Sequence, residues 1–289
     1  MAAKKLSVII LTYNSESDID KCLHFVYQNN DLNDELEIII VDNNSVKQVE
    51  LRSHIENEYP EVIYIQNTSN TGYGSGNNLG IRASKADYVV IMNPDVRLRK
   101  FSFKAIYQQY IENDKLGILG FMQYESMHKK GSSFVMLKPS ITSFLLSKFY
   151  YRTNLFNPDL YCFHGSCFSF RKASFDAVGF FDESIFLYGE ERYLHIYLTQ
   201  KREYYASMDR NQSYIHPMHG RVAQPNQAEF GLQSYLYTIN KFKLSKSSAL
   251  KAQIRFEKLF LYKSLLFGRK VQAEFHRNKI KRLNEVLAD

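Results

Sequence analysis

Cysteine is scarce in this chain of 289 residues, and long apolar runs are missing. Its three cysteines, Cys22, Cys162 and Cys167, form no CxxC pair and are too few for the disulfide framework of a small secreted domain, so we expect reduced thiols in or near a core. No apolar run approaches the roughly 18 to 20 residues that a membrane-spanning helix needs. The first residues, MAAKKLSVIILTYN, contain no signal-peptide cleavage pattern. These absences predict a globular, cytoplasmic protein.

Positive charge is in excess but unevenly distributed. The formal net charge is +7, yet residues 1–100 hold ten lysines and arginines against fourteen acidic residues, whereas residues 241–289 hold thirteen against four. Because the basic residues do not extend along the chain, the pattern argues against a nucleic-acid partner. It indicates a local surface near the C-terminus that contacts something anionic.

Short β-branched apolar runs recur in the first hundred residues, at 6–11, 36–41, 61–66 and 87–92. The runs are continuous rather than alternating, which is typical of strands covered by helices on both faces. Helical patterns fill the gaps between them. This order predicts an α/β fold with a Rossmann-like, mostly parallel sheet flanked by helices.

Polar residues follow the end of each predicted strand, where a parallel α/β sheet binds its ligands. They are Thr12-Tyr13-Asn14, Asp42-Asn43-Asn44-Ser45, Gln66-Asn67 and Asn93-Pro94-Asp95. No GxGxxG fingerprint follows the first strand, so a plain NAD-binding domain is not expected. The same place, LTYNSES, has no glycine, which argues against a sugar-phosphate nucleotidyltransferase.

Four segments together resemble one enzyme family. They are SVIILTYN (7–14), IIIVDNNS (38–45), NTGYGSGNNLGIRASKADYVVIMNPD (70–95) and GSCFSFRKASFDAVGFFDESIFLYGEE (165–191). In this order, over roughly residues 5–220, they resemble the inverting family 2 glycosyltransferases, particularly the bacterial rhamnosyltransferase-like enzymes that build surface polysaccharides. The resemblance implies an A-type glycosyltransferase fold.

The resemblance also divides the chain. It implies a catalytic domain at 1–225, with a nucleotide-sugar-binding half at 1–100 and an acceptor half at 101–225. Residues 226–289 lie beyond the family pattern and are expected to form a basic helical appendage of two or three helices. This appendage is interpreted either as packed on the catalytic domain or a partner subunit, or as a patch that contacts an anionic membrane surface.

For the donor, the resemblance places Thr12 and Tyr13 beside the base and ribose, and the next residue, Asn14, is also expected to bind the donor. The resemblance places Asp42 on a uracil or thymine ring, where the carboxylate would accept the N3 hydrogen; a helix N-cap with Asn43, Asn44 or Ser45 is the alternative.

The glycines 72, 74, 76 and 80 are interpreted as a loop whose backbone lies close to the donor, with Asn70 and Asn77 supplying polar contacts. A flexible loop that merely enters a helix is the alternative for this segment.

A divalent cation is the expected cofactor. The resemblance places Asp95 of the NPD sequence as a metal ligand, with Asn93 as an outer contact and His216 of SYIHPMHGRV as a second ligand to metal or diphosphate, near His219 and Arg221. One carboxylate leaves most ligand positions to diphosphate and water, which Mg²⁺ accepts, whereas carboxylate plus imidazole suits Mn²⁺ better. The alternative is that the histidines only cap a strand.

The catalytic pair is expected at Glu190-Glu191, where the family has Glu-Asp at the start of a helix. The resemblance makes Glu191 the base that takes the proton of the acceptor hydroxyl and gives Glu190 a supporting role. A charged helix start that favours the helix dipole is the alternative. Residues 122–164 carry no motif, and their position suggests that they shape the acceptor pocket.

The predicted function is therefore metal-dependent, inverting transfer of a hexose from dTDP-rhamnose or a UDP-hexose to a hydroxyl of a glycan, in cell-surface polysaccharide synthesis. A lipid-linked acceptor, a peripheral position at the inner face of the cell membrane and a homo-oligomer all stay open. The alternative is a catalytically degenerate family member that binds a nucleotide sugar or a partner without turnover.

Overall fold

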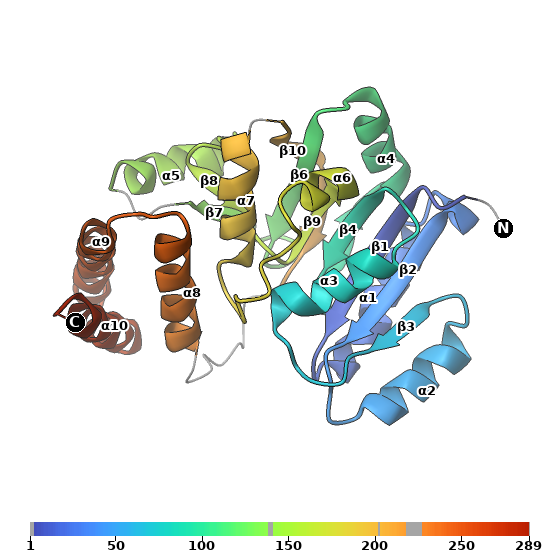
Figure 1. Cartoon of the computed structure of the whole chain (residues 1–289), viewed down its shortest axis with the longest axis horizontal. Helices are drawn as coiled ribbons and strands as arrows, with labels where there is room; N and C mark the ends of the chain where they lie inside the picture. The colour runs from blue at the N-terminus through green and yellow to red at the C-terminus, as the bar shows by residue number, and fades with distance from the viewer. Residues whose placement is uncertain (1–2, 138–140, 202, 218–226, 289) are drawn as a thin grey trace.

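The computed structural model describes residues 3–137, 141–201, 203–217 and 227–288. These residues form one large, mostly parallel sheet with helices on both faces, followed by helices at the C-terminal end (Figure 1). Within the described residues the sheet has eight strands in the order β3-β2-β1-β4-β9-β6-β10-β5. The predicted fold class is confirmed.

The first four strands are parallel, as predicted. They are β1 (Leu6–Thr12), β2 (Leu36–Asp42), β3 (Ile63–Gln66) and β4 (Tyr88–Met92). In the β1–β2 register the last residues of the two strands, Thr12 and Asp42, lie opposite each other. The polar residues that follow these strands therefore meet at one edge of the sheet.

The second half of the sheet is mixed. It consists of β5 (Arg97–Lys100), β6 (Leu116–Tyr124), β9 (Cys167–Arg171) and β10 (Tyr205–Ile215). Strand β9 runs antiparallel between β4 and β6, whereas β10 is parallel to β6 and antiparallel to β5. A separate two-stranded antiparallel sheet pairs β7 (Phe134–Met136) with β8 (Tyr161–Phe163).

Helices cover both faces because successive strand residues point to opposite sides. Val8 packs in a core with α1, α2 and α4, whereas its neighbour Ile9 packs in a second core with α3, α6 and α7. The helices are α1 (Glu16–Gln28), α2 (Gln48–Glu58), α3 (Tyr73–Ala83), α4 (Phe103–Glu112), α6 (Lys172–Asp176) and α7 (Glu190–Lys201). A 3-10 turn spans Asn33–Glu35, and α5 (Ile141–Thr153) precedes β8.

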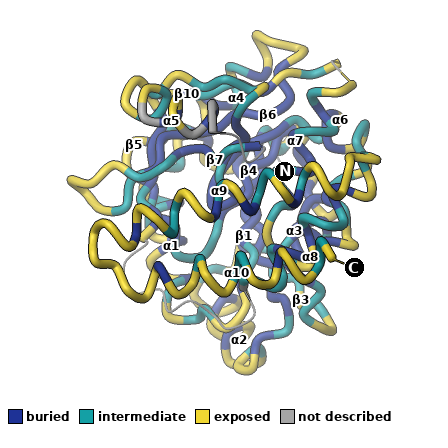
Figure 2. Tube along the Cα trace, turned by 90° about the vertical axis from the view of Figure 1, so that its left-hand side faces the viewer, coloured by how far each residue is buried: buried dark blue, intermediate teal, exposed yellow. Residues whose placement is uncertain are grey.

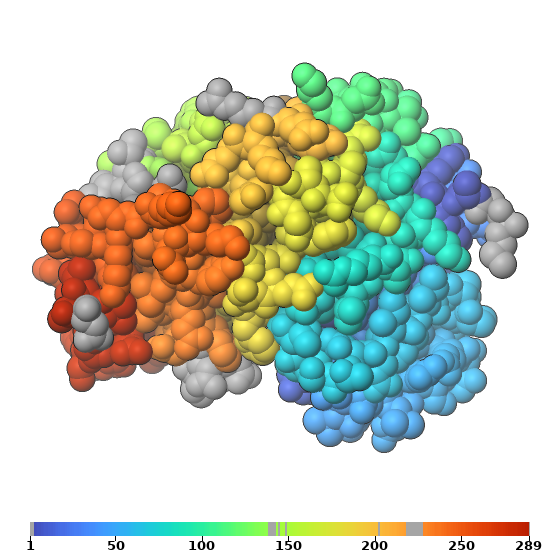
Figure 3. Space-filling view, in the orientation of Figure 1, coloured from blue at the N-terminus to red at the C-terminus, as the bar shows by residue number. Residues whose placement is uncertain are grey.

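Three helices follow the sheet, α8 (Gln227–Lys241), α9 (Lys246–Leu266) and α10 (Lys270–Ala288). They share a small core of Leu232, Leu250, Ile254 and Leu283. Helix α8 also contacts the segment before α7, because the Tyr237 hydroxyl donates to Asp182 Oδ2 over 2.7 Å. The space-filling view shows α8 seated against that segment (Figure 3). Among the described helices, none is long and apolar enough to cross a membrane.

Candidate active site

The edge where β1 and β2 end is held together by short polar contacts. Asn14, which follows β1 with a positive φ of 51°, donates its backbone N–H to Ser45 Oγ over 2.8 Å and accepts the Val46 N–H at Oδ1 over 2.8 Å. The Thr12 hydroxyl is buried and has no hydrogen-bond partner among the described residues. Tyr13 is 47% exposed, so its ring borders this edge from the solvent side.

Asp42 is fully buried, and both of its carboxylate oxygens accept hydrogen bonds. Oδ1 accepts the Ser45 N–H over 2.9 Å, and Oδ2 accepts the Tyr64 hydroxyl over 2.7 Å. Burial, followed by this bond to Asp42, raises the pKa of Tyr64, so the hydroxyl stays a donor. The helix N-cap given as the alternative is wrong, because α2 begins only at Gln48; the Asp42 carboxylate instead closes the turn 42–45. Base recognition by Asp42 stays a prediction.

The glycine segment differs from the expected loop. Gly74, Gly76 and Gly80 lie inside α3, so the prediction of a donor-side loop is wrong for these three. An added Cβ would lie 2.6 Å from Leu11 Cδ1 at Gly76 and 2.6 Å from Ile9 Cγ2 at Gly80. These glycines let the helix approach β1 closely. The sequence pattern could not separate this use from a ligand loop, because both require the absence of a side chain.

Gly72 remains at the end of the loop that enters α3. It has a φ of 91°, and a Cβ there would lie 2.2 Å from the Phe186 carbonyl oxygen. The Asn43 amide ties this loop to the strand edge by donating to Asn70 Oδ1 over 2.8 Å and to the Gly72 carbonyl over 3.1 Å. Asn77 is fully buried in α3, where its amide donates to the Tyr73 carbonyl over 2.9 Å.

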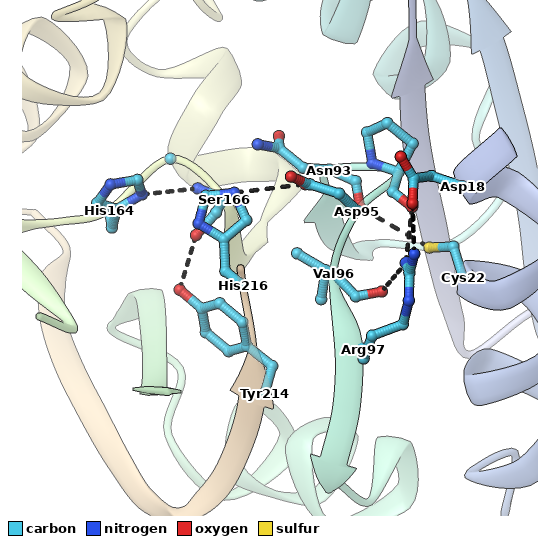
Figure 4. Close-up of polar contacts among 12 residues, drawn as sticks. Asp18, Cys22, Asn93, Asp95, Val96, Arg97, His164, Ser166, Tyr214 and His216 are labelled. Carbon is cyan, nitrogen blue, oxygen red and sulfur yellow. Dashed lines mark hydrogen bonds and ion pairs between the residues drawn. The ribbon is translucent and has the colours of Figure 1, made fainter. Parts of the chain in front are cut away.

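Asp95 and His216 come together from distant parts of the sequence. His216 Nε2 lies 3.3 Å from Asp95 Oδ1; the His216 side chain is fully buried, and that of Asp95 is 25% exposed (Figure 4). His216 follows β10 and donates its backbone N–H to the Tyr124 carbonyl over 2.8 Å. The sheet thus places the imidazole beside the carboxylate as the sequence predicted.

Arg97 shapes the turn that carries Asp95. Its guanidinium donates to the carbonyls of Pro94 and Val96, each over 2.9 Å, and to Asp18 Oδ1 over 2.7 Å (Figure 4). Asn93 joins this turn to β9, because its backbone N–H donates to the Ser166 carbonyl over 2.9 Å. Arg97 was not among the predicted site residues, and its position two residues after Asp95 is the only signal that pointed to it.

A divalent cation fits between the two side chains. Two adjacent ligands at about 2.1 Å from an octahedral metal stand about 3 Å apart, close to the observed separation of His216 Nε2 and Asp95 Oδ1. Across the described residues, no group of three or more His, Cys, Asp or Glu side chains is arranged to hold a metal. Asp95 and His216 would therefore supply two ligands and leave the others to a bound diphosphate and water. His219 and Arg221 lie outside the described residues.

The carboxylate pair opens α7, as predicted. Glu190 is 2% exposed; its burial, and then the charge and hydrogen bond of Glu191, raise the pKa of Glu190 well above its usual range. Glu191 Oε2 is buried without a hydrogen-bond partner in the part of the chain that is described. At neutral pH the raised pKa favours a protonated Glu190, which leaves Glu191 as the candidate base of the pair.

The segment 164–166, between β8 and β9, connects these groups. His164 lies with its ring centroid 5.5 Å from that of His216, and the Ser166 carbonyl accepts from Asn93. At Gly165 an added Cβ would lie 2.9 Å from Glu191 Oε1, and the Gly165 carbonyl accepts the Tyr73 hydroxyl. Residues 165–191 carry the family resemblance, but His164, Gly165 and Ser166 were not among the predicted site residues.

The fold and this arrangement define a class of protein. A mostly parallel sheet with an antiparallel strand beside β4, and an Asp and a carboxylate pair at the carboxyl edge, is that of an A-type glycosyltransferase. Residues 7–179, more than half of the chain, match the family described as Glycosyl transferase family 2. The chain belongs to this family.

Relatives and solved structures agree with this assignment. The Low-salt glycan biosynthesis hexosyltransferase Agl10 of Haloferax volcanii is 27% identical over 256 residues, which cover 84% of this chain and 76% of that enzyme. The fold is similar to that of the mannosyltransferase PcManGT from Pyrobaculum calidifontis in complex with GDP-Man and Mn²⁺, with a TM-score of 0.57 at 15% identity over 100% of this chain and 86% of the other. It is also similar to that of GalNAc-T7 with UDP, GalNAc and Mn²⁺, with a TM-score of 0.63 at 12% identity over 81% of this chain and 48% of the other.

Proposed function

We propose that this glycosyltransferase is metal-dependent and inverting, and that it transfers a hexose from a nucleotide-diphospho-sugar to a hydroxyl of a glycan in surface polysaccharide synthesis. The approach of His216 to Asp95 at the carboxyl edge of the sheet carries the proposal. Mn²⁺ in the two similar solved structures supports a divalent cation. Those structures hold GDP-Man in one case and UDP with GalNAc in the other, so dTDP-rhamnose and UDP-hexoses are tested together with GDP-mannose.

In the proposed reaction, Asp95 and His216 would hold a divalent cation beside the donor diphosphate. The cation would stabilise the negative charge of the departing nucleoside diphosphate. Glu191 accepts the proton of the acceptor hydroxyl while that oxygen bonds to the anomeric carbon, and the bond to the diphosphate breaks on the opposite face. This displacement inverts the anomeric configuration. Burial and the neighbouring Glu191 raise the pKa of Glu190, so Glu190 keeps its proton and is not the proposed base.

Donor binding is the first test. A ligand that binds only the native state raises its stability, so the matching nucleotide sugar with Mn²⁺ or Mg²⁺ is expected to raise the Tm. Asp95→Ala is expected to lose the metal-dependent part of the shift and keep the parental Tm without ligand, because a 25% exposed strand-end carboxylate adds little to the core. An unchanged metal dependence in Asp95→Ala would contradict the ligand assignment. Binding without any sugar release to water or acceptor would favour the degenerate, non-catalytic alternative.

We also propose that residues 226–289 form a distinct appendage that contacts an anionic membrane surface. The turn joining α9 to α10 exposes a compact apolar set, with Leu266 81% and Val271 85% exposed. Figure 2 looks onto these two helices and shows their exposed outer residues. The exposed apolar and basic residues of this tip are Tyr262, Lys263, Leu265, Leu266, Phe267, Arg269, Lys270 and Val271.

The basic residues among these exposed side chains favour an anionic partner for the tip. Basic side chains beside apolar ones match an anionic lipid surface, where each basic residue contributes about 1 kcal/mol. Such contact would place the enzyme at the inner face of the cell membrane, close to a lipid-linked acceptor. In vesicle flotation, binding to phosphatidylglycerol but not to phosphatidylcholine is expected, and Leu266→Glu is expected to weaken it. Leu145→Glu, at a 69% exposed leucine of α5, is the control. Equal loss in both variants, or none in Leu266→Glu, would contradict the proposal.

A further inference from the structure

A large pocket lies between the start of α7 and the C-terminal helices, on the side of the molecule away from β1 and β2 (Figure 1). Its volume is about 830 Å³, within the range of pockets that bind small molecules. Strand β7 and residues 188–192 form one wall, and α8, α9 and α10 form the others. The rings of Tyr235 and Phe275 and the amides of Gln253 and Asn278 also line it, a mixture that suits the apolar faces and hydroxyls of sugars.

Most charged groups at this pocket already have partners within the protein. Glu257 is 4% exposed and pairs with Lys279 Nζ over 2.6 Å and with His276 Nδ1 over 2.7 Å. Burial alone would raise the pKa of Glu257, but these two partners hold it below its usual value. Arg282 pairs with Glu229 over 3.3 Å.

Arg192 is the exception among the described cations that line the pocket. Its Nε is buried and has no hydrogen-bond partner, and no ion pair of its guanidinium exists with a described residue. A buried N–H group without an acceptor is costly, and an anion bound to it would remove that cost. Arg192 lies in the first turn of α7, so this helix fixes its position in the pocket wall.

Arg192 is the residue after Glu191, the proposed base. A ligand that pairs with Arg192 in the pocket is therefore held against the same helical turn that would receive the acceptor proton. The donor edge lies on the other side of this turn, at the ends of β1, β2 and β4. A group bound in the pocket consequently belongs to the acceptor side of the reaction and not to the donor diphosphate.

We infer that this pocket binds an oxyanion carried by the saccharide acceptor, a phosphate or a carboxylate, through the Arg192 guanidinium. A planar guanidinium forms two parallel hydrogen bonds with either group, which fixes both position and orientation. The inference rests on the proposed transferase function and specifies its acceptor as an anionic glycan. The C-terminal helices then serve to complete an acceptor site, since they supply three of its walls.

Binding of simple sugars tests the inference without knowledge of the natural acceptor. Dissociation constants of glucose 6-phosphate, glucuronate and methyl glucoside are measured by ligand-observed NMR without nucleotide. The parent is expected to bind one of the two anionic sugars at least about ten-fold more tightly than methyl glucoside, the usual effect of a charge-assisted hydrogen bond. Preference for the phosphate or for the carboxylate identifies which oxyanion the acceptor carries.

Three variants locate the effect. Arg192→Gln is expected to abolish the preference for the anionic sugar, and Arg192→Lys, which keeps the charge, to retain part of it. Arg277→Gln is the matched control, because Arg277 is exposed and pairs with Glu274 on α10 over 2.7 Å. The inference is overturned if the parent shows no preference, if Arg192→Gln keeps it, or if Arg277→Gln loses it equally.

A fourth variant separates this site from the donor site. If Asp95→Ala abolishes the preference, the anion binds at the diphosphate position and the inference is wrong. The Mn²⁺-dependent Tm shift with nucleotide sugars, recorded on the same proteins, tests the proposed function separately. If the protein binds the anionic sugar through Arg192 but binds no nucleotide sugar, the pocket inference stands and the proposed transferase function is wrong. If the protein binds a nucleotide sugar but shows no preference for the anionic sugar, only the inference about the pocket is wrong.

Discussion

Asp95 shows how one side chain acquires a role from its backbone. Pro94 fixes its own φ directly after β4, and Arg97 holds the carbonyls on both sides of Asp95, at Pro94 and Val96. The carboxylate is thus held outward, beside His216. Because the proposed chemistry depends on single carboxylates such as this one, single substitutions can test it.

Glu191→Gln tests the assignment of the base. The change keeps the size of the side chain and removes its ability to accept a proton, so transfer is expected to fall by about 10²- to 10⁴-fold. Donor and metal affinity are expected to stay near the parental values. Steady-state transfer and donor binding are measured in parallel. Near-parental turnover in Glu191→Gln, together with a collapse in Glu190→Gln, would move the base to Glu190.

Glu190→Gln has a separate consequence for stability. Because the pKa of Glu190 is raised in the folded state, the folded protein retains its proton above the unfolded pKa near 4.5, and stability falls as the pH rises from there towards the folded pKa. Glutamine avoids this loss, so Glu190→Gln is expected to gain Tm over the parent at pH 7 and to lose that gain at pH 4. Thermal unfolding at the two pH values measures it. A gain that does not change with pH would mean that Glu190 is ionised in the folded protein.

Asp42→Asn tests base recognition at the strand edge. Asparagine keeps an acceptor for the Ser45 N–H, so the turn 42–45 is expected to survive, but the charge that would meet the N3 hydrogen is lost. Affinity for UDP and dTDP is expected to fall by about 1 to 3 kcal/mol, the value of a hydrogen bond to a charged group. Calorimetric titration of the two nucleotides measures the change. Parental affinity would leave Asp42 with its structural role alone.

At the scale of elements, helix α3 illustrates how packing constrains the position of the site. Its glycines allow α3 to lie against β1 and β2. This close approach fixes the position of Gly72 at the start of the helix, and so the position of the loop before it. The short segment 164–166 then joins that region to β9. Both features depend on contacts between elements that are far apart along the chain.

Gly80→Ala tests this close approach. The added methyl group would meet Ile9 Cγ2 at 2.6 Å, so we expect a loss of about 1 to 3 kcal/mol from overpacking, offset in part by the better helix propensity of alanine. Gly231→Ala is the matched control, because Gly231 is also helical and nothing lies within 4 Å of its Cβ position. That variant is expected to be stabilised by roughly 0.5 to 1 kcal/mol. Urea unfolding compares the two, and equal effects would contradict the packing argument.

At the scale of the whole molecule, the sheet and the C-terminal helices contribute to different sides of the proposed reaction. The carboxyl edge of the sheet carries the proposed donor-binding residues, and α8 to α10 enclose the pocket beside α7. The turn between α9 and α10 consists largely of exposed residues (Figure 2). Donor binding, acceptor binding and surface contact are therefore expected to be separable.

Removal of residues 245–289 tests this separation. The truncated protein keeps α8 on the catalytic part through Tyr237 and Asp182. It is expected to retain the metal-dependent Tm shift with nucleotide sugar but to lose flotation with anionic vesicles and the preference for an anionic sugar. Loss of nucleotide binding in a protein that is still folded by circular dichroism would contradict it.

The sequence determined the parts of this protein that depend on local pattern. Continuous apolar runs predicted the parallel strands, because residues buried on both faces need no polar alternation, and the polar residues after them predicted the edge where ligands bind. The start of α7 at Glu190 and the helices after residue 225 also followed from short-range pattern. The short motifs that contain Asp95 and His216 predicted both residues as site residues, and the fold brings His216 Nε2 within 3.3 Å of Asp95 Oδ1.

Only the tertiary structure decided what depends on long-range packing. The glycines of α3 serve helix-to-strand contact, Asp42 binds Tyr64 and the Ser45 N–H, and the segment 164–166 links the two halves of the site. The pocket at Arg192 needs walls from β7, α7 and three later helices. No local pattern encodes such a meeting, because it arises from the free energy of burying several distant surfaces together.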